Sequence, residues 1–138
     1  MYFTIRLINR YVKYKTSQDV GTMSEVIRHI IRETNDAFSR NEGESFLDFC
    51  SDDMSWKIAG GTTLNGKEEI RTFLNENKCP GPPIVQNCSI IVEGTSAACH
   101  GDMTMDTGDG KDKKYSFCDV YEFTGDKISK LTSYVVPA

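Results

Sequence analysis

Apolar residues recur at two different periods along the chain. After residue 22 they recur every three or four positions, which is typical of one face of an amphipathic helix. Thr22 followed by Glu25 has the spacing of a capping box, so we expect the helix to begin there. The residues on this predicted inner face are Val26, Ile27, Ile30, Ile31, Thr34, Ala37 and Phe38.

Two shorter helices and one strand are predicted in the next 40 residues. A short helix should follow Asn41, with the apolar run of residues 46–50 on its inner side. Residues 54–58 alternate between apolar and polar positions and predict a strand. A third helix should begin at Asn65, with Glu68 in the capping position, and end before residues 79–83, because proline has no amide hydrogen to continue the helix.

The second half of the chain has the alternating pattern of strands. The four predicted strands are separated by glycine-containing turns and cover residues 84–93, 97–106, 114–123 and 127–136. Helices come first and strands follow, which favours an α+β fold with three N-terminal helices on one face of an antiparallel meander. A strongly curved sheet with helices over its concave face would enclose a conical cavity, and such a cavity is the default ligand site.

Charge is distributed unevenly along the 138 residues. Residues 1–22 have four basic side chains and one acidic one, whereas residues 23–138 have a net charge of −7. We expect residues 1–22 to be a flexible N-terminal extension and residues 23–138 to be a single domain. The acidic domain argues against a nucleic-acid partner. No apolar run is long enough to span a membrane, so we expect no membrane partner and a cytoplasmic protein.

The five cysteines show neither paired spacing nor an even count. A zinc site needs thiolates or imidazoles at close paired spacings, and a small disulfide scaffold has an even number of cysteines. We therefore expect reduced thiols that are mostly buried, with no metal and no cofactor.

Two longer runs resemble a known family. FLDFCSDDMSWKIAGGTTLNGKEEIRTFL and FCDVYEFTGDKISKLTSYV are similar to the SnoaL-like polyketide cyclases and their ketosteroid isomerase relatives, within the nuclear-transport-factor-2-like superfamily. The likeness covers residues 24–136. It implies a cone-shaped, cystatin-like fold, a homodimer formed through the sheet, and a small hydrophobic ligand such as a steroid-like or polyketide-like carbonyl compound.

The family's chemistry transfers only in part. Asp119 matches the acidic group that ketosteroid isomerase relatives keep in the penultimate strand, but their base falls on Ile58 and their helix tyrosine on Thr34. The epoxide-hydrolase relatives would need charged groups where this chain has Phe117 and Ser133. The cyclase relatives depend mainly on one pocket aspartate that acts as both acid and base, and Asp119 fits that role.

Alternation also places Asp119 in an apolar environment. The residues that share its predicted strand face are Tyr115, Phe117, Tyr121 and Phe123. Burial among these rings would raise the pKa of the carboxyl group and let it exchange protons near neutral pH. The alternative is a structural aspartate that accepts a hydrogen bond from a neighbouring amide or hydroxyl group.

A second polar face in residues 97–106 presents His100 and Asp102. If this face lies on the same side of the sheet as Asp119, His100 could act as a base. It could equally face solvent or a dimer partner, because a shift of one residue in the register reverses the answer. Trp56, which alternates with Ile58, could line the pocket wall or belong to the ordinary core. The other residues that we expect to line the pocket are Thr34, Phe38, Ile58, Asp102, Phe117 and Tyr121.

Three functions remain open. The protein could be an enzyme that isomerises or cyclises a small apolar carbonyl compound through Asp119. It could instead be a ligand-binding or scaffold module without catalysis, or a dimerisation domain that carries a partner on its sheet. The fold alone does not separate these functions.

Overall fold

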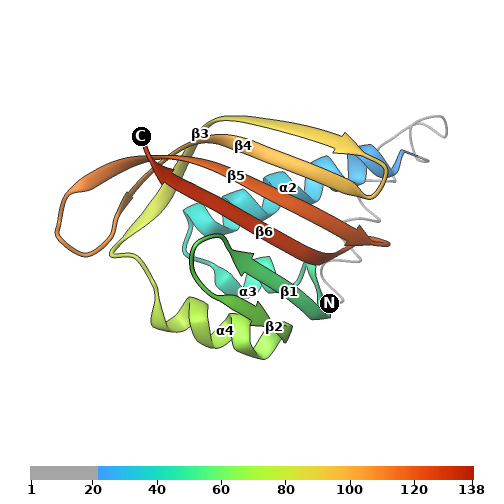
Figure 1. Ribbon diagram of the computed structural model, residues 1–138, viewed down its shortest axis with the longest axis horizontal. Helices are drawn as coiled ribbons and strands as arrows, with labels where there is room; N and C mark the ends of the chain where they lie inside the picture. The colour runs from blue at the N-terminus through green and yellow to red at the C-terminus, as the bar shows by residue number, and fades with distance from the viewer. Residues whose placement is uncertain (1–21) are drawn as a thin grey trace.

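The computed structural model describes residues 22–138 (Figure 1). The predicted extension, residues 1–22, therefore lies almost wholly outside the described residues. The described part begins with helix α2 (Met23–Ser39) and the short helix α3 (Gly43–Leu47), and a third helix, α4 (Gly66–Glu76), follows two strands. This order agrees with the three helices that the apolar spacing predicts.

Six strands form a single sheet. Their bounds are β1 (Cys50–Ile58), β2 (Thr63–Asn65), β3 (Gly81–Glu93), β4 (Ser96–Asp106), β5 (Asp112–Thr124) and β6 (Lys127–Pro137). The strand order is β2-β1-β6-β5-β4-β3, and every neighbouring pair is antiparallel except β1 and β6. Strands β3 to β6 form the predicted meander. The three-residue strand β2 is too short to show an alternating pattern, and sequence analysis did not predict it.

The helices begin close to the predicted residues, although the capping bonds differ from those expected. Thr22 is the N-cap of α2, but its side chain makes no capping hydrogen bond. At α4 the backbone N–H of Asn65 donates to the Glu69 carboxylate at 2.7 Å, and Glu68 instead pairs with Arg71. The predicted start of α4 is therefore correct, but the capping carboxylate is that of Glu69 and not that of Glu68. The two glutamates are adjacent in the first turn, so the spacing alone did not distinguish them.

Strand β3 lies at one edge of the sheet and contains Pro82 and Pro83. Proline cannot donate a ladder hydrogen bond, so an edge strand is where it can be accommodated. The register between β3 and β4 shifts between Gln86 and Ser89, and Asn87 there has a φ of 54°. This bulge allows the edge strand to curve over the inner face of the sheet.

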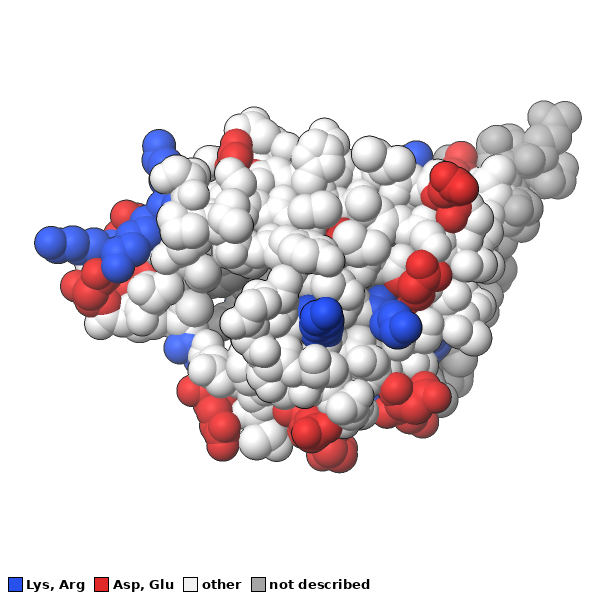
Figure 2. Space-filling model, viewed as in Figure 1, with Lys and Arg blue, Asp and Glu red and all other residues white. Residues whose placement is uncertain are grey.

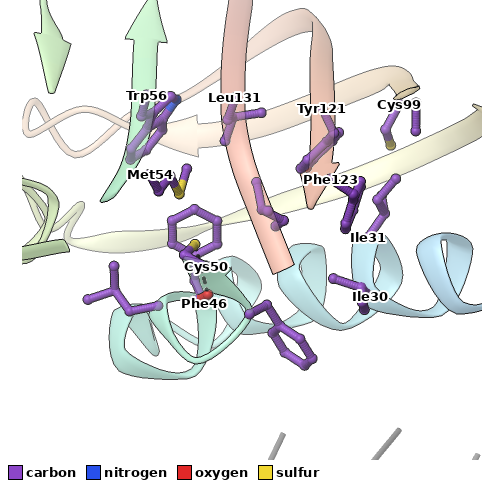
Figure 3. Packing of buried hydrophobic residues seen from close by; sticks show 14 of the residues in the cluster. Ile30, Ile31, Phe46, Cys50, Met54, Trp56, Cys99, Tyr121, Phe123 and Leu131 are labelled. Atoms are coloured by element: carbon purple, nitrogen blue, oxygen red, sulfur yellow. Dashed lines mark hydrogen bonds between the residues drawn. The ribbon is translucent and has the colours of Figure 1, made fainter. Parts of the chain in front are cut away.

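The core fills the space between the helices and the inner face of the sheet (Figure 3). The fully buried side chains of α2 include Ile27, Ile30 and Ile31, which come from the predicted apolar face. Phe46 of α3 packs near Trp56, with ring centroids 5.7 Å apart, and its carbonyl oxygen accepts a hydrogen bond from the Cys50 thiol at 3.4 Å. These contacts hold the short helix α3 against strand β1.

The outer face of the sheet carries no helix and few charges near its centre (Figures 1 and 2). Several of its large apolar side chains are exposed; those on β3, β5 and β6 are Ile84, Ile91, Val120, Tyr134 and Val136. Among residues 22–138, no helix is long and apolar enough to cross a membrane.

Candidate functional site

A pocket of about 310 Å³ opens between the inner face of the sheet, the end of α2, and the segment that joins α4 to β3. Its wall is mostly apolar. The carbon-rich and sulfur-containing side chains that line it are Phe38, Trp56, Ile58, Phe73, Pro83, Val85, Met103, Met105, Phe117, Leu131 and Val135. Such a wall favours a ligand with a large apolar surface.

Asp119 is the carboxylate of the pocket wall. It lies on β5 opposite Cys99 of β4 and Ser133 of β6, so all three side chains point to the inner face. Asp119 keeps some accessible surface because it faces the cavity, but protein atoms surround its carboxyl group. Burial raises its pKa to about 6, and a hydrogen bond with Ser133 opposes that shift.

Ser133 connects Asp119 to the aromatic wall. The indole N–H of Trp56 donates to the Ser133 hydroxyl oxygen at 2.9 Å, which leaves the hydroxyl hydrogen free to be donated to Asp119. Both Trp56 and Ser133 are less than one-tenth exposed, at 8% and 6%. The resulting chain, Trp56 to Ser133 to Asp119, orients the carboxyl group from one side.

Trp56 is itself held by neighbouring rings. Its ring centroid lies 5.7 Å from that of Phe46, 5.9 Å from that of Phe73 and 6.2 Å from that of Phe38. These separations lie in the range in which aromatic pairs attract each other. The packing leaves the indole with little freedom to turn, so the direction of its N–H is set by the core.

Tyr121 and Thr34 lie beside the pocket, in the fully buried core. The Thr34 hydroxyl donates to the Ile31 carbonyl oxygen at 2.8 Å. The Tyr121 hydroxyl has no hydrogen bond of standard geometry among residues 22–138, although Thr34 lies close enough to oppose its pKa shift. Burial, followed by the charge of Asp119, raises the pKa of Tyr121 well above 10. Tyr121 therefore stays neutral beside Asp119. Neither residue belongs to the pocket wall, where we expected both.

His100 and Asp102 point away from the pocket. His100 is opposite Cys118, and Asp102 is opposite Ser116, so both lie on the face of the sheet that does not carry Asp119. Both side chains are exposed, and the Asp102 carboxylate accepts a hydrogen bond from the Asn87 amide at 3.0 Å. The expectation that His100 supplies a base to this pocket is therefore wrong.

The other predicted wall residues, Phe38, Trp56, Ile58 and Phe117, do line the pocket. Sequence reasoning missed Ser133 as a partner of Asp119 and missed the contributions of Met103 and Met105. Extrapolation from the tight turn at residues 125–126 would pair Asp119 with Thr132, because the β5–β6 register shifts by one residue between Glu122 and Phe123. The Ser133 contact therefore depends on that irregularity, and the Trp56 bond depends on the parallel β1–β6 pair. Among residues 22–138, no three potential ligands are grouped to hold a metal ion.

Comparison with known families agrees with this geometry. The model of the SnoaL-like domain matches residues 31–131, which is most of the chain. The chain belongs to the SnoaL-like family. The match runs from α2, through the strands that carry Trp56 and Asp119, to the middle of β6.

Solved structures resemble this SnoaL-like protein in fold. A nuclear-transport-factor-2-like protein of unknown function from Cytophaga hutchinsonii is 22% identical, with a TM-score of 0.65, and the match covers 83% of this chain and 100% of that one. A nuclear-transport-factor-2-like protein from Anabaena variabilis is 17% identical, with a TM-score of 0.72 and coverage of 83% and 89%.

A third structure, from Xanthomonas campestris, is provisionally named a polyketide cyclase. It is 16% identical, with a TM-score of 0.71, and the match covers 80% of this chain and 90% of that one. At such low identity these likenesses establish the fold and leave the activity open. None of the curated proteins compared with this chain matches it.

Proposed function

We propose that the pocket binds a small, largely apolar carbonyl compound and that Asp119 transfers a proton to and from it. The observation that carries this proposal is a carboxyl group with a pKa of about 6 in a mostly apolar cavity of about 310 Å³. A group with such a pKa is partly protonated and partly ionised near neutral pH. It can remove a proton from a carbon next to a carbonyl group and return it elsewhere on the ligand.

Each neighbour has a separate part in this proposal. The apolar wall binds the ligand by excluding water from its surface. Ser133, held by Trp56, donates to the ionised carboxylate and fixes its position, so it acts as a positioning residue. The net reaction is the movement of one proton within the ligand, as in isomerisation or in the enol-forming step of an aldol cyclisation. The name of the Xanthomonas neighbour is compatible with the second reaction.

A second candidate is ligand binding without chemistry. What favours it is the composition of the wall, because the polar side chains that accompany Asp119 there are Asn35, Asn77, Cys79 and Ser133. None of these side chains replaces the catalytic base or the helix tyrosine of ketosteroid isomerase relatives. In this chain Ile58 and Thr34 occupy the positions of those two groups. The apolar wall would then supply most of the binding free energy, and Asp119 would only orient the ligand.

Proton exchange separates the two candidates. Cyclic ketones, steroid ketones and anthraquinone-type polyketides would first be screened by thermal shift, since a ligand that binds the folded state raises the melting temperature. The best ligand would then be incubated in heavy water, and deuterium entry next to its carbonyl group measured by mass spectrometry. Under the proposal, wild type catalyses this entry and Asp119→Asn binds the ligand but loses the exchange, by about 100-fold or more.

The matched control is Asp102→Asn, which removes a carboxylate from the other face of the same sheet. It should leave the exchange rate unchanged. If ligands bind to wild type and no deuterium enters above the buffer rate, the protein is a binding module. If no apolar ligand shifts the melting temperature, both candidates fail.

We also propose that the outer face of the sheet pairs two copies of the protein. The support is the family resemblance together with the exposure of Ile91, Val120, Tyr134 and Val136, which is 61%, 38%, 49% and 57%. These side chains lie on a face that the helices leave uncovered (Figure 1). A contiguous apolar surface on a small domain marks an interaction site.

A further inference from the structure

A groove of about 330 Å³ runs along the outside of the cone, between α2 and the edge strand β3. Two cysteines come together at its floor. Cys88 of β3 is exposed and lines the groove, whereas Cys99 of β4 is completely buried beneath it. The side-chain amide of Asn35 on α2 donates to both sulfurs, at 3.6 Å to Cys88 and 3.5 Å to Cys99.

The β3 bulge explains how these two thiols meet. Between the pairs Gln86–Asp102 and Ser89–His100, strand β3 has one residue more than β4. The extra residue bends β3 inward, and Gly101 leaves room for it, because a Cβ atom there would lie 3.1 Å from the Cα of Cys88. Cys88 is thereby placed close enough to Cys99 to help raise the pKa of the Cys99 thiol, and both sulfurs accept from the same Asn35 amide.

We propose that Cys88 and Cys99 are a redox pair that closes an intramolecular disulfide when the protein meets a peroxide. In the first step the Cys88 sulfur attacks one oxygen of hydrogen peroxide, the O–O bond breaks, and the products are a sulfenic acid and water. In the second step the Cys99 sulfur attacks the Cys88 sulfur, and the sulfenic oxygen leaves as a second water with the Cys99 proton. Overall two thiols are oxidised to one disulfide and one peroxide is reduced to two waters.

The two cysteines have different surroundings that fit these two roles. The groove around Cys88 is open to solvent, so a small peroxide can reach the sulfur, and its lining contains Arg28 and Arg32 against one carboxylate, Asp36. Burial and contact with Cys88 raise the pKa of Cys99 to about 12. Cys99 therefore stays protonated and shielded until a sulfenic acid forms next to it.

The shared contact with Asn35 places the two sulfurs on the same side of the β3–β4 pair. Both lie within 3.6 Å of one nitrogen atom, and closure would require them to move to the roughly 2 Å separation of a disulfide. The disulfide would join the edge strand β3 to β4. The Asn35 amide would then no longer donate to two thiol groups. Because Asn35 also lines the cone, oxidation would alter one part of the pocket wall. The redox pair itself does not depend on what the pocket binds.

The test uses the full chain. Reduced protein would be treated with hydrogen peroxide near neutral pH, blocked with iodoacetamide, digested without reductant by a protease that cuts after glutamate, and mapped by mass spectrometry; Glu93 provides a cleavage site between the two cysteines. We expect one dominant cross-linked species that joins the Cys88 and Cys99 peptides, with a loss of about two mass units for the two thiol hydrogens. Dithiothreitol should reverse it.

Three variants assign the roles. Cys88→Ser should remove the cross-link and leave Cys99 unoxidised, whereas Cys99→Ser should let a sulfenic acid accumulate at Cys88, where dimedone traps it. Cys118→Ser, which removes a half-buried thiol from the opposite face of the sheet, should leave the cross-link intact. Intermolecular dimers through Cys88, cross-links to another cysteine, or a Cys88 that oxidises fully without bridging would each overturn the proposal. The wild-type map alone decides the matter if a variant does not fold.

Discussion

Asp119 keeps its carboxyl group inside the cone, and the free energy of that burial depends on pH. Its folded-state pKa, about 6, lies above the ordinary value of 3.8 because burial disfavours the charged form. The folded protein therefore binds a proton at Asp119 more tightly than the unfolded chain does. The stabilisation is fully present below about pH 4 and is lost as the pH rises through about 6.

Asp119→Asn should reveal this linkage. Asparagine resembles the protonated acid in shape and cannot ionise, so the variant should match wild type near pH 4 and be more stable above pH 7. The difference in the free energy of unfolding should reach about 3 kcal/mol, from about 1.4 kcal/mol per pKa unit. Urea unfolding of both proteins from about pH 4 to 8 measures it. A difference that does not change with pH would show that Asp119 is not desolvated.

Ser133→Ala tests the hydrogen bond that opposes the shift. Without the hydroxyl group the ionised carboxylate loses a donor, so the pKa of Asp119 should rise further above 6. The Trp56 indole N–H would also lose its acceptor, and this loss should lower the free energy of unfolding by about 1–2 kcal/mol. The pKa can be followed by carbon NMR of the Asp119 carboxyl group. An unchanged or lower pKa would contradict the arrangement, and Ser116→Ala, on the opposite face of β5, serves as the control.

At the scale of elements, the β3 bulge is the feature that shapes both the pocket rim and the cysteine pair. It depends on a close approach of two backbones at Gly101. A Cβ atom at this position would lie 2.8 Å from the Gln86 carbonyl oxygen and 3.1 Å from that of Asn87. Backbone atoms cannot swing aside as a side chain does, so the bulge needs glycine opposite it.

Gly101→Ala should therefore destabilise the protein by about 1–3 kcal/mol, because strand β3 must move away from β4. Gly81→Ala is a matched control in the same strand pair. Its new methyl group would meet the Asp106 Cβ at an ordinary 3.6 Å, and stability should change by less than about 0.5 kcal/mol. Thermal unfolding of both variants would measure the two effects, and equal effects would rule out the close approach as the cause.

At the scale of the whole molecule, the helices cover one face of the sheet and leave the other uncovered (Figure 1). The covered face holds the core and the pocket. The uncovered face presents apolar side chains on β3, β5 and β6 together with His100 and Asp102. A second copy of the chain would cover this surface without obstructing the cone, whose walls belong to the other face.

Tyr134→Glu should dissociate the proposed dimer. Tyr134 lies beside Cys118 on the outer face and is 49% exposed, so a charge there would be buried in a sheet-to-sheet interface. Light scattering after size exclusion should give twice the monomer mass for wild type and the monomer mass for the variant. Lys111→Glu, at the β4–β5 turn, changes charge away from this surface and should leave the dimer intact. A monomeric wild type would refute the dimer.

Local patterns in the sequence predicted every element except the short strand β2, and their order along the chain. The apolar stripe of α2, the prolines that follow α4 and the alternation of β3 to β6 all depend on residues that are neighbours in the chain. The same alternation placed Phe117, Asp119, Tyr121 and Phe123 on one face, and the register confirms it. Periodicity has this power because side-chain direction follows directly from backbone geometry.

The side of the sheet on which His100 lies was decided only by the tertiary structure. A shift of one residue in the β4–β5 register would turn His100 from the exposed face to the pocket face of the sheet. Cross-strand pairing fixes that register. The bond from Trp56 to Ser133 joins strands that are distant in sequence, and the meeting of Cys88 with Cys99 needs both a bulge and a side chain from α2. Local spacing determined what each element is, whereas contacts between elements determined the site, because no short-range pattern encodes a long-range distance.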